Sequence, residues 1–294
     1  MAPLGVSFRV MPPINIEFYQ PTVESDDGLT FADVLTQVEN MPMVQRLRTD
    51  FDPAGIFGLT RDGDEFMGDA ARIRMEDLPR IVNLATGQRH DLNVRPREGL
   101  SEEMHFIYDA TVDVIAIQVK RQMRASALRG LLADLTQQRI GFNIILREDA
   151  LQRFQHMGLV KKIFFKIARP QDLQGQAPPA LVQVFRELDE FNGVAAKVEI
   201  SVERARNRWL SMDAVRGILD RFRARNADFD ALSITGLLRD EGVERQETID
   251  FVHEHLRHTE EVERRGRRLA PEGCRVALRR AIRAHRPYLL RLRA

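Results

Sequence analysis

The sequence has few of the residues that would assign it to a specialised class of protein. It contains one cysteine, Cys274, among 294 residues, and its apolar runs are all shorter than a membrane span. A single cysteine excludes an intrachain disulfide framework and a zinc site built from cysteines, which suits a reducing compartment. The N-terminal stretch MAPLGVSFRVMPPINIEFY has no basic start followed by an apolar run, so it does not resemble a secretory signal. We expect a cytoplasmic protein that does not insert directly into a membrane.

Lysine and net charge are also scarce. Only five of the 44 basic residues are lysines, and the 43 acidic residues leave a formal net charge of +1. Such a balance does not indicate a nucleic-acid-binding protein, so that function would require bases gathered in one place. The excess of arginine fits contacts with phosphates or carboxylates, and it equally fits a genome biased toward arginine codons.

The hydrophobic pattern predicts an α+β protein of two domains, each with a β-sheet packed by helices, and a helical C-terminal region. Residues 1–98 form the first domain, with short strands and a helix over 31–38. Residues 99–294 form an α/β or α+β domain whose Arg-rich C-terminal part would serve dimerisation and DNA binding. Within 99–294 the pattern predicts strands at 105–119, 141–147, 159–170 and 196–204, and helices at 125–138, 148–158 and 178–193. From Leu210 onward we expect mainly helix, with strand character near 231–238.

The predicted strand LVKKIFFKIARP, residues 159–170, carries most of the lysines in the chain. No acidic residue occurs from 150 to 171, so its charge needs a partner from elsewhere. Alternation places Lys162, Phe164 and Lys166 on one face, and Ile163 and Phe165 on the face that suits the core. An aromatic side chain between two lysines suits a phosphate backbone or a stacked base. A solvent-facing strand whose charges are balanced by acids from elsewhere in the fold explains the pattern as well.

Further bases could join this strand on a DNA-binding surface. One cluster, Arg204, Arg206 and Arg208, lies at the end of the strand predicted at 196–204, and a second, Arg221, Arg223 and Arg225, lies at the end of a predicted helix. The second cluster also has a structural explanation, because basic residues at a helix C-terminus interact favourably with the helix dipole. The tail from 264 to 294 carries eleven arginines against one acid, Glu272. It could be a dimerisation element, a DNA-backbone element or a solvated last helix. The candidate DNA-binding residues are Lys161, Lys162, Lys166, Arg169, Arg204, Arg206, Arg208, Arg221, Arg223 and Arg225.

Signals for catalysis or metal binding are weak. There is no Gly-rich phosphate loop, nucleophile elbow or triad signature. His255 and His258 would share a helix face, which suits zinc or two histidines beside the core. Asp113 followed by Gln118-Val119-Lys120 faintly suggests a restriction-type nuclease, but the predicted single strand leaves no turn between them. We expect no catalytic residues, no metal site and no cofactor.

The middle of the chain resembles the RexA family of phage exclusion proteins. The resemblance rests on EEMHFIYDATVDV (102–114), SALRGLLADL (126–135), FNIILRED (142–149) and VKKIFFKIARP (160–170), in this order and spacing over roughly 95–205. It implies a two-domain homodimer of a temperate phage or prophage that binds DNA with little sequence preference. It also implies a role in phage exclusion and in the lysis–lysogeny decision, a structural relation to RdgC, and a membrane partner of the RexB type. The pair Lys161-Lys162 matches a basic pair of the family, which implies contact with DNA.

The leading hypothesis is therefore a non-enzymatic homodimer that binds double-stranded DNA through its phosphates. A sensor module whose basic surface meets an acidic partner protein is the first alternative. A metal-dependent nuclease is the second.

Overall fold

The computed structural model describes residues 11–50, 52–167, 196–202, 208–224, 229–240, 243–266 and 268–293. It is an α+β protein with two compact units, one made of residues 1–141 with 257–294 and the other of residues 142–256. The predicted boundary between residues 98 and 99 is therefore wrong. The reason is strand pairing: β7 (Leu100–Asp109) pairs along its whole length with β4 (Glu65–Arg74), so the sheet of the first unit runs across that position.

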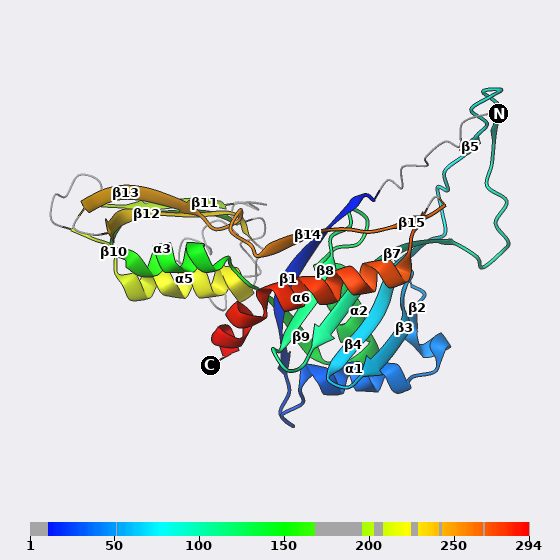
Figure 1. The fold of residues 1–294 in the computed structure, drawn as a ribbon, viewed down its shortest axis with the longest axis horizontal. Helices are drawn as coiled ribbons and strands as arrows, with labels where there is room; N and C mark the ends of the chain where they lie inside the picture. Colours follow the sequence, from blue (N-terminus) through cyan, green and yellow to red (C-terminus); the bar gives the residue numbers. More distant parts are fainter. Residues whose placement is uncertain are drawn as a thin grey trace, which may run out of the picture. The chain divides into compact units, whose positions relative to one another are not determined.

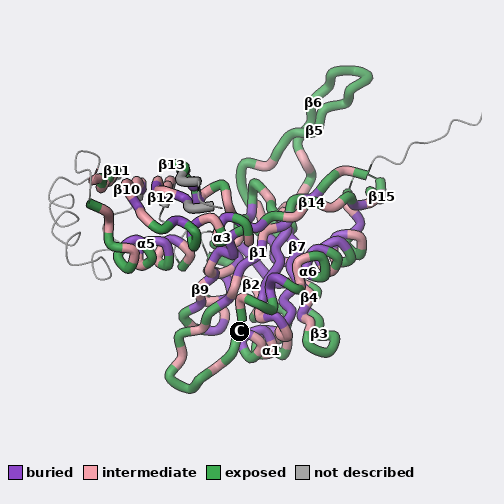
Figure 2. Tube along the Cα trace, turned by 60° about the vertical axis from the view of Figure 1, so that its left-hand side comes forward, coloured by how far each residue is buried: buried purple, intermediate pink, exposed green. Residues whose placement is uncertain are grey.

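The first unit is built on an eight-stranded sheet (Figure 1). Its main strand order is β14-β1-β8-β7-β4-β3-β2, and β9 (Arg139–Ile144), in which the chain passes to the second unit, also pairs with β1. A small hairpin of β5 and β6 extends away from the sheet (Figure 2). The remaining elements of this unit are β1 (Pro13–Glu24), α1 (Phe31–Asn40), the 3-10 helix η1 (Met43–Arg46), β2 (Leu47–Arg48), β3 (Ala54–Asp62), β5 (Ile81–Val82), β6 (Arg89–His90), β8 (Val114–Gln118), α2 (Ala125–Thr136), β14 (Arg257–Glu261), β15 (Arg264–Arg265), β16 (Arg268–Leu269) and α6 (Pro271–Arg293).

Helices cover both faces of this sheet. The ring of Tyr108 meets Phe31 of α1 edge to face, whereas the neighbouring Asp109 meets Arg286 of α6. Because adjacent residues of a strand point to opposite faces, α1 and α6 lie on opposite sides of β7. Helix α1 begins where the sequence has a capping box, in which Thr30 and Asp33 bond each other's backbone. The buried strands thus form the middle of three layers (Figure 2).

The predicted long strand at 105–119 is two strands. β7 and β8 form an antiparallel hairpin joined at residues 110–113, where Asp113 has a positive φ of 54°. A non-glycine residue tolerates this left-handed conformation best when it is Asp or Asn. The sequence around the turn, YDATVDV, lacks glycine and keeps its apolar alternation, which hid the reversal.

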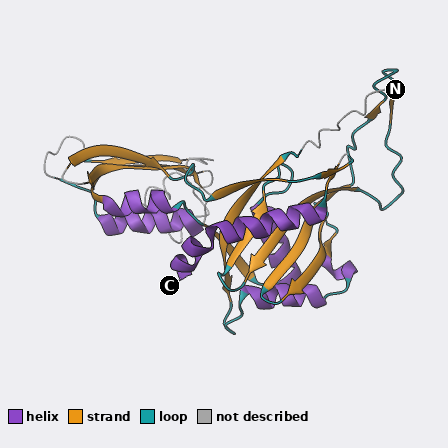
Figure 3. Cartoon of the chain, viewed as in Figure 1, coloured by secondary structure: helices purple, strands orange, loops and turns teal. Residues whose placement is uncertain are grey.

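The second unit is a four-stranded antiparallel sheet in the order β11-β10-β12-β13, with α3 and α5 on one side of it (Figures 1 and 3). Helix α5 buries Val215, Ile218, Leu219 and Phe222 at helical spacing, and it packs on β10. The elements are α3 (Glu148–His156), β10 (Met157–Ile167), β11 (Ala196–Ser201), α5 (Met212–Ala224), β12 (Phe229–Asp240) and β13 (Val243–Asp250). The helix predicted at 178–193 lies outside the described residues.

The region after Leu210 contains the predicted C-terminal helix but is not mainly helical. Strands β12 to β16 occupy much of the chain between α5 and α6. Strand β12 confirms the strand character expected near 231–238, where Ser233-Ile234-Thr235 alternates polar and apolar residues, whereas β13 to β16 are strands that the sequence pattern did not indicate. Among the described residues, no helix combines the length and the apolar character that crossing a membrane requires.

Candidate functional site

The sheet of the second unit has one buried face and one open face. Ile163 and Phe165 are each 1% exposed and lie on the side of α3 and α5, as their alternation predicts. The alternate side chains, Lys162, Phe164 and Lys166, point the other way and are only partly covered. We call the set Lys162, Phe164, Lys166 and Lys197 the lysine face. Lys197, on β11, stands directly opposite Lys166 in the antiparallel register.

One lysine of the lysine face pairs with an acid on the neighbouring strand. The ammonium of Lys162 lies 2.9 Å from a carboxylate oxygen of Glu199 on β11, and both side chains are substantially exposed. An acid distant in sequence therefore balances the charge of Lys162, as predicted for a solvent-facing strand whose charges are balanced from elsewhere in the fold. Lys166 and Lys197 lie opposite each other, so the register brings two like charges onto the same face of the sheet.

Lys161 lies apart from the lysine face. Its ammonium sits 5.6 Å from the centre of the Trp209 ring, in a cation–π arrangement. The amide of Leu210 donates to the carbonyl of Val160, which continues the ladder beyond β11 and brings the exposed Arg208 close to the start of β10. Arg208 can thus extend the basic region along this edge of β10.

The other predicted bases do not all join this surface. Arg221 and Arg223 lie in the last turn of α5, on the helix that covers the opposite side of the sheet. The Nε atom of Arg223 is buried, and no hydrogen-bond partner for it lies among the described residues. The remaining candidates, Arg169, Arg204, Arg206 and Arg225, lie outside the described residues.

Several arginines of α6 bind acids and carbonyls of the first unit. Arg279 contacts Glu65 at 2.6 Å and Asp62 at 3.0 Å, and the hydrogen bond to Glu65 raises the pKa of its guanidinium. Arg286 contacts the buried Asp109 at 2.9 Å. These pairs give part of the Arg-rich tail a structural role that the local excess of positive charge concealed.

A buried polar group lies beneath the first turns of α6. His105, 5% exposed, places Nδ1 at 2.6 Å from Asp69 Oδ1, and Arg275 holds the other oxygen of Asp69 at 3.1 Å. Burial opposes the charge on His105, but the hydrogen bonds to Asp69 and to the buried Cys274 outweigh it and raise its pKa to about 9. The one signal in the sequence was a polar residue within the apolar run of β7.

The histidines near residue 255 are not a helical pair. His255 is buried in an isolated bridge with Leu146, and His258 lies on β14. His258 contacts His285 of α6 at 3.2 Å, and burial, followed by the proximity of His258, lowers the pKa of His285. Among the described residues, no three His, Cys, Asp or Glu side chains are arranged to hold a metal ion.

The residues of the faint nuclease pattern lie in the turn before β8, on β8 and just after it. Asp113 lies in the turn before β8 and accepts a hydrogen bond from the Tyr108 hydroxyl, whereas Gln118 lies at the far end of β8. The turn of the β7–β8 hairpin contains Asp113 and precedes β8, so no turn lies between Asp113 and Gln118, as the sequence predicts. The acid and Lys120 lie at opposite ends of one strand, which does not place them around a common metal.

The candidate surface lies within a stretch that matches a protein family. A family model, described only as a family of unknown function, matches residues 68–268, which is more than half of the chain. The match begins in β4, spans the second unit and ends before α6. No curated protein matches the sequence.

Proposed function

This chain belongs to that family, DUF6731, and we propose that it binds double-stranded DNA through the lysine face without reading the base sequence. The observation that carries the proposal is the concentration of lysine. Four of the five lysines in the chain lie on the adjacent strands β10 and β11, and three of them form the lysine face around Phe164. A phosphate near Lys166 and Lys197 would contact two bases at once.

The pair of Lys162 and Glu199 does not prevent this role. Exposed ion pairs contribute about 1 kcal/mol or less, so Lys162 can exchange the carboxylate for a phosphate at small cost. Phosphate contacts supply affinity without sequence information, and a sheet face carrying three lysines offers few groups for reading base edges. The resemblance to RexA extends the proposal to a cytoplasmic homodimer of a temperate phage, acting in phage exclusion and the lysis–lysogeny decision beside a RexB-like membrane protein.

Salt dependence tests the proposal directly. Fluorescence anisotropy would follow binding of the full chain to two unrelated duplexes over a series of salt concentrations. Each phosphate contact contributes about −0.9 to the slope of log affinity against log salt, so Lys162→Ala/Lys166→Ala/Lys197→Ala should make the slope shallower by about 2.7. Both duplexes should bind equally well.

A matched control removes the same charge from elsewhere. Arg89, Arg280 and Arg283 are exposed and lie outside the lysine face, so their triple alanine variant should keep the wild-type slope. Arginine at all three lysine positions should keep most of the affinity. Absence of binding at low salt, or equal slopes for the wild type and the lysine variant, would contradict the proposal. Weakened capture of an acidic protein with unchanged DNA affinity would favour the protein-interaction alternative.

A further inference from the structure

A second basic site lies in the first unit, in a cavity of about 980 Å³. Its walls come from four places: the start of β1, the outer part of β7, the residues after β8, and the segment from β15 to the start of α6. This volume is within the range of small-molecule pockets, which are typically 300–1,000 Å³. Segments distant in sequence thus converge on one pocket that is partly open to solvent.

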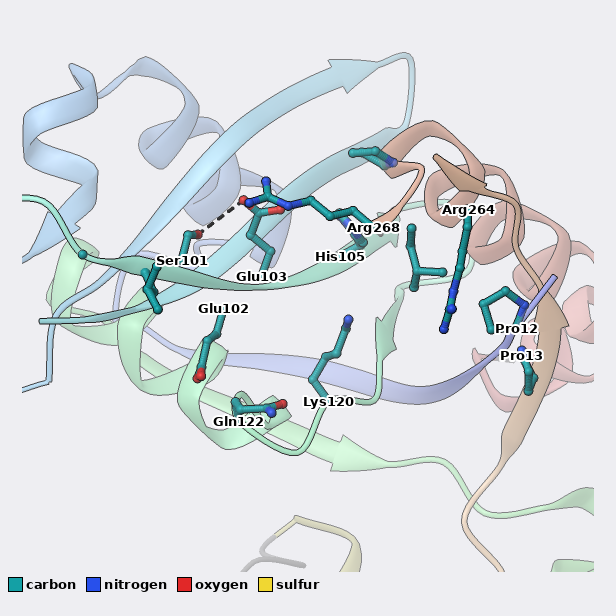
Figure 4. A pocket seen from close by; sticks show the side chains of 14 residues that line it. Pro12, Pro13, Ser101, Glu102, Glu103, His105, Lys120, Gln122, Arg264 and Arg268 are labelled. Atoms are coloured by element: carbon teal, nitrogen blue, oxygen red, sulfur yellow. Dashed lines mark hydrogen bonds between the residues drawn. The ribbon is translucent and has the colours of Figure 1, made fainter. Parts of the chain in front are cut away.

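Two cations point into the cavity. Figure 4 shows Lys120, after β8, and Arg264, on β15, extending into it from opposite walls. Within the part of the chain that the structure describes, neither side chain forms an ion pair. This contrasts with Arg275, Arg279 and Arg286 of α6, each of which meets a carboxylate. Arg268 adds a third cation to the wall.

The floor of the cavity is also polar. His105 lines it from β7, and its hydrogen bond to Asp69 keeps the imidazole in place. His105 is only 5% exposed, so its side chain cannot turn away into solvent as the bases of a surface cluster can.

The same cavity contains acids. Glu102 and Glu103 line it from β7, and Glu103 accepts a hydrogen bond from the Ser101 hydroxyl at 3.3 Å (Figure 4). Carboxylates would repel a continuous nucleic-acid backbone, but they accept hydrogen bonds from hydroxyl or amino groups. The amide of Gln122 offers a further donor and acceptor. The lining therefore suits a ligand that is anionic at one end and rich in donors at the other.

We propose that this cavity binds a small phosphorylated molecule with hydroxyl or amino donors, the chemical class of nucleotides and sugar phosphates. The phosphate lies between Lys120 and Arg264, and the donor-bearing part of the ligand faces Glu102 and Gln122. Charge-assisted hydrogen bonds to phosphate hold the first end, and the acids discriminate against simple polyanions. The site is separate from the lysine face, so the inference does not rest on DNA binding.

Isothermal titration calorimetry of the full chain tests this, with ADP, glucose 6-phosphate and inorganic phosphate as probes. At least one of the two organic phosphates should bind more tightly than roughly 1 mM and more tightly than inorganic phosphate. Lys120→Ala/Arg264→Ala should weaken that binding at least about tenfold, because two charge-assisted contacts are lost. Glu102→Gln should weaken binding of the organic phosphate while leaving the affinity for inorganic phosphate unchanged.

Arg280→Ala/Arg283→Ala removes two exposed charges of α6 and should leave the affinity unchanged, and circular dichroism would verify that every variant is folded. Failure of both organic phosphates to bind would overturn the inference. So would equal affinities of the wild type and the Lys120/Arg264 variant. If the Lys120/Arg264 variant instead binds duplex DNA tenfold more weakly than the wild type and no small phosphate binds, the cavity belongs to a nucleic-acid surface and the small-molecule assignment is wrong.

Discussion

The buried pair of His105 and Asp69 predicts a specific dependence of stability on pH. The pKa of His105 is about 9 in the folded chain, whereas an unfolded histidine titrates near 6.5. Because the folded value is the higher one, the pair stabilises the fold fully below pH 6.5. The stabilisation is lost as the pH rises through 9. The difference between the two values corresponds to about 3 kcal/mol of unfolding free energy.

The surrounding charges define what is being titrated. Asp69 faces His105 from β4, whereas Cys274 and Arg275 face it from α6. Arg275 also pairs with Asp69, so the carboxylate keeps one cationic partner after His105 loses its proton. Loss of the proton should therefore lower the stability of the first unit without leaving Asp69 unpaired.

The perturbation is His105→Gln, which removes the titrating group and keeps a side chain able to form hydrogen bonds. Urea unfolding would be followed from pH 6 to pH 10 by circular dichroism. Fluorescence of the single tryptophan, Trp209, would identify the transition of the second unit. The unfolding free energy of the wild type should fall by about 3 kcal/mol more than that of the variant over this range.

His253→Gln is the matched control, because the side chain of His253 is 79% exposed. Its stability should follow that of the wild type across the whole range. If the curves of the wild type and His105→Gln run parallel from pH 7 to pH 10, the reasoning about His105 and Asp69 is refuted.

Three further predictions concern stability. Phe165→Ala should lower the unfolding free energy by about 3–5 kcal/mol, whereas Phe164→Ala should lower it by about 1 kcal/mol or less, because only Phe165 is fully buried. Similar urea midpoints for the two variants, followed by Trp209 fluorescence, would contradict the assignment of faces. Thr30→Ala should cost about 1 kcal/mol by removing the cap of α1, and Thr30→Ser should restore it, as measured by thermal unfolding. Arg286→Ala should lower the unfolding free energy by about 2 kcal/mol, because it removes the cation beside Asp109, which is 2% exposed and would keep only its hydrogen bonds from Thr111. An unchanged urea midpoint would show that this ion pair contributes little.

Several features of the molecule follow from short stretches of sequence. The capping residues of α1 predict where it begins, and alternation along 159–170 correctly assigns Ile163 and Phe165 to the core. The α+β class follows from the same periods. Even Lys197 could have been found, since the strand pattern of 196–204 places it on one face with Glu199. These properties are local because backbone geometry alone sets which way successive side chains point.

Other features depend on which strands become neighbours. The first unit combines residues 1–141 with 257–294, and the partners of the α6 arginines come from strands about 200 positions earlier. Glu199 reaches Lys162 only through the register of β10 and β11, and Lys120 and Arg264 line the same cavity although they are far apart in sequence. Local periodicity thus sets the faces of helices and strands. Which charges find a partner and which line a cavity depends on strand order and register, because these arise from pairing across the whole chain.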